Sequence, residues 1–562
     1  MWEARRNSLA VPGTATEAQV TAANATASSS IYSLLLGNPF NVANTAIVGT
    51  DGKINQSAVL KVDDTDWTSP LERIGMRKNI DMNYSAATDK SDYYVSVGYL
   101  DESGYLLKSD FTRFTGRANV NFQVKEWFKT GFNIGASTSK GNQSQATSDQ
   151  TSSFVNPVRF SRSMAPIYSI YMHNADGSYL LDANGEKQYD LYAARPQGGN
   201  NGRHIFAEID WNEDLDKINA LNSKAYVDFR LLTGLNLTLN ASLEQRDYVN
   251  SEYRNKLIGD GAPLGAASRF NTKRSTLGLN QLLNYTKSFD KHNLSALLGH
   301  ESYKFLYNET YQYKTQQIAD GNYELINFVN TTENYTIEDR ETGESYFSRL
   351  SYDYDNKYYI SGSYRTDGTS KFSEDKRWGD FWSVGLAYRL EKESFLKDVK
   401  FLDLLKLRAS YGELGNNLGI NYYAYQGLYD IGVNNQTEPG ILLNSLSSPN
   451  LFWETSVNKD VALEFGLFNR INGTIEYYHR ISDNLLFNVP LPLSSGVETR
   501  IENIGAMFNS GIELGLNFDV IKKENLEWNL GFNASTVKNE FTELSQPEII
   551  TGTKKLMVGR SI

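Results

Sequence analysis

The chain has 562 residues, enough for several domains or for one large β-barrel, and its formal net charge is −11. This acidic balance argues against a nucleic-acid partner, because binding phosphates requires a basic surface. The sequence contains no cysteine, which excludes disulfides and thiolate metal sites. No apolar run approaches the roughly 20 residues that a transmembrane helix needs, so any membrane crossing has to be made by strands.

The first 66 residues are rich in Ala, Thr, Ser and Asn and show no sustained periodicity, so they predict a loop or linker. Arg5 and Arg6 are not followed by the apolar stretch that an export signal contains. An exported protein needs such a signal. We therefore expect the chain to be an internal fragment of a longer exported protein.

From Asn79 onward, apolar and polar residues alternate with a period of two, which predicts about sixteen strands. The segment from Ser345 to Leu390 shows the pattern best: Tyr346, Leu350 and Tyr354 share one face, and Arg349 lies on the other. In the same way, Leu386 and Arg389 fall on opposite faces. The predicted strands are 78–86, 91–101, 111–124, 128–140, 220–232, 235–249, 272–289, 291–313, 345–354, 357–366, 380–390, 404–413, 453–468, 471–485, 503–521 and 526–544.

Strands of about ten residues, with one polar face and one apolar face rich in Tyr and Trp, are typical of a transmembrane β-barrel with a wet lumen and aromatic girdles. The connections support this class because short turns and long loops alternate along the chain. The long connections are 102–110, 141–219, 250–271, 314–344, 367–379, 414–452 and 486–502. In an up-and-down membrane barrel the long loops face outside, whereas a soluble sandwich or propeller has no reason to sort its loops in this way.

The longest connection, 141–219, is too long to lack structure, so we expect it to fold over the mouth of the barrel. Aromatic residues in such loops are candidates for stacking on a sugar ring or clamping a peptide, because tyrosine combines a rigid ring with a hydrogen-bonding tip. For each of these loop aromatic residues, packing against another loop is an equally good interpretation. The candidate substrate-binding residues are Tyr168, Tyr171, Tyr179, Tyr422, Tyr423 and Tyr425. Aromatics on the apolar face of strands are predicted to form girdles.

No catalytic, cofactor or metal-binding constellation is predicted. The five histidines show no ligand spacing, and the adjacent pair His300-Glu301 points to opposite faces of a strand. An acidic run of five residues, Glu208, Asp210, Glu213, Asp214 and Asp216, lies in or near the long loop and predicts a solvated segment. A structural calcium ion held by this run remains an alternative. We therefore expect the chain not to be an enzyme.

Eight segments, in a fixed order from residue 65 to residue 513, resemble the SusC/RagA family of TonB-dependent outer-membrane transporters, found mainly in Bacteroidetes. They are Thr65-Asp66-Trp67; Tyr93-Tyr94-Val95-Ser96-Val97-Gly98-Tyr99; Arg113-Phe114-Thr115-Gly116-Arg117-Ala118-Asn119; Ser363-Tyr364-Arg365-Thr366-Asp367-Gly368-Thr369-Ser370-Lys371-Phe372; Arg377-Trp378-Gly379; Leu405-Lys406-Leu407-Arg408-Ala409-Ser410-Tyr411-Gly412; Pro449-Asn450-Leu451-Phe452-Trp453-Glu454; and Asn503-Ile504-Gly505 with Asn509-Ser510-Gly511-Ile512-Glu513. Each segment alone is weakly specific, but their joint order is specific.

The resemblance implies an antiparallel barrel of about 22 strands, of which about sixteen are predicted here. Members of the family begin with a signal peptide, a TonB box and a plug domain, and none of these precedes Trp2. The expected organisation is therefore a post-plug or linker segment over residues 1–77 and a partial barrel over 78–562. The partial barrel should form an open gutter, with the strands near 78–86 and 526–544 as unpaired edges.

The resemblance also implies a function. It predicts a cell outer-membrane importer of a bulky nutrient, an oligosaccharide or a peptide. The expected partners are a SusD-like surface lipoprotein, the TonB–ExbB–ExbD complex acting through N-terminal parts missing here, and outer-membrane lipids. A passive porin-like channel is the first alternative, and a soluble secreted β-protein that binds glycans is the second.

Overall fold

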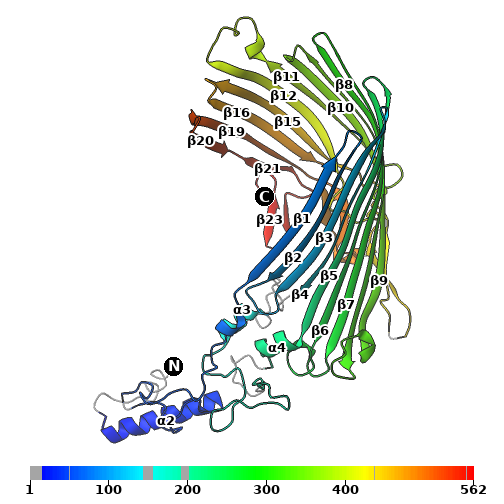
Figure 1. The fold of residues 1–562 in the computed structure, drawn as a ribbon. Helices are drawn as coiled ribbons and strands as arrows, with labels where there is room; N and C mark the ends of the chain where they lie inside the picture. The colour runs from blue at the N-terminus through cyan, green and yellow to red at the C-terminus, as the bar shows by residue number, and fades with distance from the viewer. Residues whose placement is uncertain are drawn as a thin grey trace.

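The computed structural model describes residues 15–49, 51–142, 156–191, 202–435, 437–551 and 553–561. A single large antiparallel sheet dominates it and forms an open, curved wall, with helices α2, α3 and α4 near one end (Figure 1). Within these residues the helices are α2 (Glu17–Leu35), α3 (Pro157–Ser163) and α4 (Ile205–Trp211), and five short 3-10 turns interrupt the loops. None of the described helices is long and apolar enough to cross a membrane.

The wall contains seventeen strands that are paired almost entirely with their neighbours in sequence. They are β1 (Met76–Ala87), β2 (Ser91–Ser103), β3 (Asp110–Lys125), β4 (Phe128–Asn142), β5 (Glu213–Leu232), β6 (Leu235–Arg254), β7 (Ala266–Phe289), β8 (His292–Gln317), β9 (Phe328–Tyr354), β10 (Tyr358–Thr369), β11 (Trp378–Arg389), β12 (Leu402–Asn416), β15 (Glu454–Leu467), β16 (Ile471–Asp483), β19 (Ala506–Lys523), β20 (Leu526–Ser535) and β21 (Lys538–Glu543). Because β20 and β21 both pair with β19, the wall is sixteen columns wide, which confirms the predicted number.

The sheet does not close. Among the described residues, β1 pairs only with β2, and β20 and β21 pair only with β19, so these strands are the two edges of the gutter. Both predicted edges are therefore confirmed. Three small hairpins of the described chain lie outside the wall. Two are in long connections, β13 (Leu428–Ile431) with β14 (Ile441–Ser445) and β17 (Leu486–Pro490) with β18 (Thr499–Asn503), and the third, β22 (Glu548–Thr551) with β23 (Lys554–Met557), follows β21.

Tight turns fix the register at the short-turn end of the wall. Between β9 and β10, Asp355 and Asn356 have φ values of +56° and +49°, and the Lys357 N–H donates to the Tyr354 carbonyl over 2.9 Å. Two successive positive φ values define the type I′ turn, whose twist matches that of antiparallel strands, and Asp and Asn tolerate this conformation better than most residues. The pairing Tyr358↔Tyr354 then sets every later pair of the hairpin.

The outer face of the wall carries an apolar band between two rows of aromatic rings. Near the short turns the row is formed by His292, Tyr354, Tyr358 and Tyr388, with centroid separations of 5.0, 6.5 and 5.0 Å. A second row includes Tyr346, 6.3 Å from Trp378. Tyr346 and Tyr354 are eight residues apart on β9, about 26 Å along a strand. At the strand tilt of about 35–45° found in membrane barrels, this corresponds to about 20 Å of height, close to the roughly 25 Å of their apolar band, and the two rows agree with the predicted girdles.

Strand β9 begins much earlier than predicted. Residues 328–344 were expected to belong to a loop, but they pair with β8 from Gln317↔Phe328 onward. They lie beyond the outer aromatic row, and most of their side chains on both faces are polar and exposed. A strand that water contacts on both faces shows no alternation of apolar and polar residues. The period of two therefore did not predict this part of β9. Strands β7, β8 and β9 therefore rise as a wall beyond the apolar band.

The segment before β1 is also more ordered than the predicted linker, because it contains α2. The helix starts at a capping box, in which the Thr16 hydroxyl accepts from the Gln19 N–H and the Gln19 side chain accepts from the Thr16 N–H. Its buried side, centred on Ala27 and Ile31, packs against Val48. Apart from Ile31, the buried residues of the helix are small or polar (Asn24, Ala27 and Ser28), so no amphipathic stripe marks the helix in the sequence. Because Met76 pairs with Ser103, the segment joins the wall at its long-loop end.

Candidate functional site at the long-loop end of the wall

The connections before β1 and between β4 and β5 fold together into one unit, which we call the loop module (residues 64–71, 156–191 and 202–212). Its apolar core consists of Trp67, Leu71, Phe160, Met164, Ile170, Ile205, Phe206 and Ile209, all less than 9% exposed. His204 is buried among these side chains, with its Nε2 2.8 Å from the Ile170 carbonyl oxygen and its Nδ1 accepting from the Ala207 N–H. The predicted folding of the long connection into a structured unit is thus seen in its described parts.

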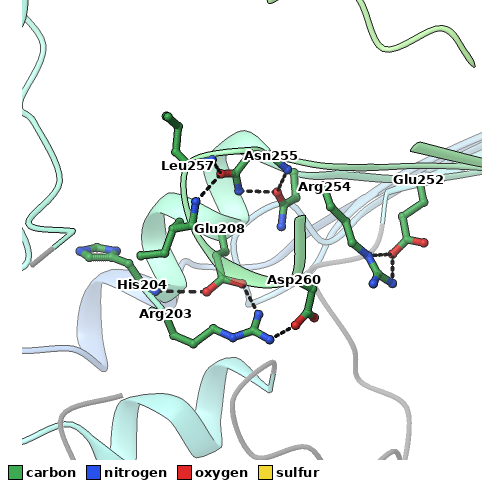
Figure 2. A network of polar contacts seen from close by, with 10 residues as sticks. Arg203, His204, Glu208, Glu252, Arg254, Asn255, Leu257 and Asp260 are labelled. Atoms are coloured by element: carbon green, nitrogen blue, oxygen red, sulfur yellow. Dashed lines mark hydrogen bonds and ion pairs between the residues drawn. The ribbon is translucent and has the colours of Figure 1, made fainter. Parts of the chain in front are cut away.

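A buried polar network ties α4 to the connection between β6 and β7 (Figure 2). The Arg203 guanidinium donates to Glu208 Oε2 over 2.8 Å and also contacts Asp260. Glu208 Oε1 accepts from the His204 N–H at 3.1 Å. Next to this cluster, Asn255 donates from both its backbone and its side chain to Asn212 Oδ1. The network therefore holds the loop module against the ends of β6 and β7.

The acidic run is solvated only in part: Asp210 and Glu213 are exposed, as predicted, but the prediction is wrong for Glu208, which is buried. Glu208 is 1% exposed within α4, while Asp214 and Asp216 lie on β5. Burial raises the pKa of Glu208, and the adjacent Arg203 opposes that shift. A buried carboxylate next to a guanidinium is stabilised by charge-assisted hydrogen bonds, which linear sequence does not reveal. In the described parts of the chain, no group of three or more His, Asp or Glu side chains is arranged to hold a metal ion.

Three of the six tyrosines predicted to bind substrate belong to the loop module. Tyr168 packs on its core, and the Tyr168 carbonyl accepts from Trp67 Nε1 over 2.9 Å. Tyr171 stacks on Tyr189 at 5.3 Å and meets Tyr179 edge-on at 5.8 Å. The Lys187 ammonium lies 3.6 Å from the Tyr179 ring centroid. In this structure these rings pack against one another and against other residues of the loop module.

The other three predicted tyrosines lie in the connection after β12, and two of them contact the wall. Tyr422 stacks on Phe305 of β8 at 5.8 Å, and the Tyr423 hydroxyl accepts from the Arg340 N–H of β9 at 3.3 Å. Tyr425 accepts at its hydroxyl from the neighbouring Gln426 side chain. The structure therefore places these two groups of tyrosines in different loops, and it brings Tyr422 and Tyr423 onto the extended wall of β8 and β9.

A further set of aromatic residues crosses the concave face of this extended wall. Tyr248, Phe270, Tyr311 and Tyr335 come from β6, β7, β8 and β9 in turn, and we call them the aromatic row. Consecutive ring centroids are 6.1, 6.3 and 5.6 Å apart. All four side chains are half-buried, so part of each ring remains accessible.

Two hydroxyl groups of the row donate to carboxylates on the same face. Tyr248 donates to Asp216 over 2.6 Å, and Tyr335 donates to Glu309 over 3.0 Å. Tyr307 also donates to Glu309. The hydroxyls of Tyr248 and Tyr335 therefore have charged acceptors, and these bonds hold the tips of those two rings in place.

The aromatic row lies far from the outer apolar band. Tyr311 follows His300, a member of the second outer aromatic row, by eleven residues along β8. At 3.3 Å per residue this is about 36 Å of strand. A hollow of about 360 Å³ adjoins the row at Asp216, which also lines it, together with residues of β2 to β5 such as Glu102, Asp110, Phe111 and Ser139. The site is thus a vestibule on the concave face of the wall at its long-loop end.

The aromatic row was not predicted from the sequence, because aromatic residues in strands were assigned to the girdles. A signal was present in β8, where Tyr303, Phe305, Tyr307 and Tyr311 all occupy odd positions. Leu298, an exposed residue of the outer face, occupies an even position, so counting in twos from it places these rings on the polar face. Counting in twos from Leu298 to Tyr311 is valid because the pairing of β8 with β7 has no register shift between them.

An all-antiparallel wall, with an apolar outer band between aromatic girdles and a polar concave face, defines an incomplete transmembrane β-barrel of the outer-membrane type. A model of the family described as TonB dependent receptor-like, beta-barrel matches residues 166–554. The chain belongs to this family of outer-membrane receptors. The match confirms the predicted localisation and the expectation that the chain is not an enzyme.

Two relatives support the more specific resemblance to SusC. TonB-dependent receptor P3 of Formosa agariphila is 30% identical over 492 residues, which cover 85% of this chain and 47% of the relative. TonB-dependent receptor SusC of Bacteroides thetaiotaomicron is 28% identical over 506 residues, covering 86% of this chain and 48% of the relative. The chain therefore spans about half the length of the curated relatives it matches.

A solved structure described as the RagAB peptide importer in a closed-closed state is similar to this chain with a TM-score of 0.75. The identity is 22%, and the match covers 88% of this chain and 55% of the solved one. At this identity the likeness shows the shared fold. Together with the SusC relative, it confirms the SusC/RagA resemblance drawn from the eight sequence segments.

Proposed function

We propose that the chain forms the wall and outer vestibule of a TonB-energised importer, which carries a bulky nutrient, an oligosaccharide or a peptide, across the outer membrane. The observation that carries this proposal is the polar, aromatic-lined concave face of a wall whose outer face fits a bilayer. The SusC relative and the fold shared with the RagAB peptide importer support the same role.

The proposed partners are a SusD-like surface lipoprotein, which would cover the vestibule, and the TonB–ExbB–ExbD complex, which would act through N-terminal parts outside this chain. We further propose that residues 1–77 are the segment leading into the barrel and that 78–562 are a partial barrel. Tyr422 and Tyr423 are the proposed substrate contacts best placed for this role, since both lie on the vestibule wall.

An uptake assay in the native host tests the proposal. A strain lacking the full-length gene should lose uptake of its cargo from a panel of fluorescent oligosaccharides and peptides, and the wild-type gene should restore it. Deleting the gene for TonB should abolish the same uptake. Uptake that persists without TonB would instead support the passive porin-like channel. Normal uptake of the whole panel in the gene deletion would contradict the importer.

The second alternative, a soluble secreted glycan-binding protein, is disfavoured by the outer face. Leu298, Leu350, Ile360 and Leu386 are 58%, 53%, 49% and 53% exposed on neighbouring strands. A soluble protein rarely leaves a continuous apolar surface of this kind uncovered, whereas a lipid bilayer covers it.

A further inference from the structure

We propose that the aromatic row is a binding site for uncharged oligosaccharides, and that the carboxylates around it exclude acidic cargo. The inference rests on the proposed import function and adds to it a location and a charge class for the cargo. It is based on the geometry of the rings, on the hydrogen-bonding capacity of the neighbouring side chains and on the balance of charge on this face.

The four rings form a continuous platform. Their centroid separations of 6.1, 6.3 and 5.6 Å leave no room for another side chain between neighbours. A sugar ring has apolar C–H faces and a polar edge, so it can lie on a half-exposed aromatic ring while its hydroxyls reach groups at the side. A row that crosses four strands suits an extended chain of such units better than a single small molecule.

The side chains next to the platform are mostly acceptors. A carboxylate can accept several hydrogen bonds, and Glu309 already accepts from Tyr307 and Tyr335 at its two oxygens. Asp214 and Asp216 accept from Asn250 over 2.7 and 3.0 Å. Lone pairs left over on Glu309 and Asp214 match the hydroxyl donors that line the edge of a sugar, and hydrogen bonds from O–H to a carboxylate are strong.

The charge on this face disfavours an anion. The strand pairing fixes which charged side chains lie on the concave face of β5 to β9, from the level of Arg246 outward. The carboxylates are Asp214, Asp216, Glu252, Glu309, Glu333 and Asp339, and the cations are Arg246, Arg254 and Arg274. Six carboxylates face three cations, and Arg254 is already paired with Glu252 at 2.8 Å. An acidic sugar would therefore meet net repulsion.

A peptide is a poorer fit for the same surface. Peptides are commonly recognised through their main chain, which pairs with a free strand edge. Here β6, β7 and β8 are paired on both sides over the length of the row, so their backbone groups are already used by the sheet. Among the described strands only β9, whose residues 328–342 pair with β8 alone, leaves an edge at one end of the row. Only a strongly basic peptide would gain from the carboxylates, and such a peptide serves as the competing probe in the test.

The test measures binding by calorimetry to the purified full-length protein in detergent. The probes are the neutral hexasaccharides maltohexaose, cellohexaose and xylohexaose, the acidic hexagalacturonate, and hexalysine. We expect at least one neutral probe to bind and hexagalacturonate not to bind. Tyr311→Ala and Tyr335→Ala should each weaken the neutral probe about tenfold. The matched control Tyr354→Ala removes an outer girdle ring and should leave binding unchanged.

A second variant tests the charge argument without removing a ring. Glu309→Gln keeps the shape of the side chain and should raise the affinity for hexagalacturonate severalfold, while Tyr335→Phe should keep most of the stacking. Preferred binding of hexagalacturonate or hexalysine, or no binding of any neutral probe, would overturn the inference. Neutral binding that is insensitive to both tyrosine substitutions would also overturn it. TonB-dependent uptake that is unchanged in these variants would leave the importer standing and refute only the proposed site.

Discussion

Trp67 Nε1 donates a hydrogen bond to the carbonyl oxygen of Tyr168 over 2.9 Å, across 101 positions of sequence. This bond joins the segment before β1 to the connection between β4 and β5. The indole ring also lies 5.8 Å from Phe160 and 5.8 Å from Phe206, so it forms the centre of the loop module. Trp67 belongs to Thr65-Asp66-Trp67, the first of the eight segments that resemble the SusC/RagA family. One residue of that segment thus stabilises the loop module.

Replacing Trp67 with Ala should loosen the loop module while leaving the wall intact. The side chain is 3% exposed, and emptying such a site costs about 3–5 kcal/mol. Hydrogen exchange should show faster exchange in residues 156–172 and 202–212, with the strands unchanged. Trp127→Ala is the matched control, because Trp127 is 55% exposed in the turn between β3 and β4. Equal protection of the module in both variants would contradict its dependence on Trp67.

Two substitutions on β11 should separate the two faces of the wall. Leu386 is 53% exposed on the outer face, whereas the Ser383 hydroxyl lies 2.6 Å from the Ser363 hydroxyl on the concave face. Leu386→Arg should cost about 2–4 kcal/mol if it lies near the midplane of the bilayer. Ser383→Arg should cost much less, because its side chain enters water. Refolding titrations of the full-length protein into lipid measure both, and equal tolerance would refute the assignment of faces.

Sequence periodicity predicted the part of the wall that the bilayer constrains. Between the two outer aromatic rows, as at Leu350 and Ile360, only one face is apolar, so the alternation is clear. Beyond that band both faces are wet, and the first half of β9 was taken for a loop. Helix α2 was missed for a related reason, since its buried side is made of small residues such as Ala27 and Ser28.

The candidate site could be predicted only in part. Loop tyrosines such as Tyr422 were identified by residue type, and the structure places that ring on Phe305. The aromatic row depends on which residues stand opposite one another in neighbouring strands, as in Phe270↔Tyr311 and Tyr311↔Tyr335. Such pairings follow from register, which a single sequence does not specify. The burial of Glu208 next to Arg203 likewise depends on how a loop folds.

Cysteine labelling of intact cells should divide the connections into two sets. The chain has no native cysteine, so each introduced thiol reports alone. Exposed positions at the long-loop end, Lys53, Glu186 and Glu374, should react with an impermeant reagent, whereas Lys90, Arg470 and Lys523 should react only after the outer membrane is breached. Lys53 is the most informative site, because it tests whether the segment before β1 lies outside. Labelling of both sets in intact cells would contradict the up-and-down arrangement.

Glu393 should make the short-turn end of the wall sensitive to acid. Its carboxylate lies 2.7 Å from Lys357 Nζ and accepts from the hydroxyls of Tyr388 and Tyr358, and these contacts lower the pKa of Glu393 to about 2. A carboxyl whose pKa is depressed in the folded state stabilises the fold above its unfolded pKa, about 4.5, and this contribution is lost as the pH falls toward about 2. Glu393→Gln should therefore lower the urea midpoint at pH 7, and the difference from the wild type should shrink below pH ~4.5. A difference that stays constant down to the acid limit would show that Glu393 contributes no ionic stabilisation.

This 562-residue chain, refolded alone into a planar bilayer, should not form a sealed pore. Nearly all side chains of β1 and all of those of β20 are exposed, and among the described strands no pairing joins these two edges. An unpaired backbone group in hydrocarbon costs several kcal/mol, so an open edge of a dozen residues cannot face lipid stably. Closing the gap with fewer strands would require a different tilt and stagger throughout the wall, because strand number and shear are linked. Single-channel recordings should therefore show irregular leaks at most, and the full-length protein is the matched comparison. Uniform, long-lived conductance steps from this chain alone would mean that its two edges can join.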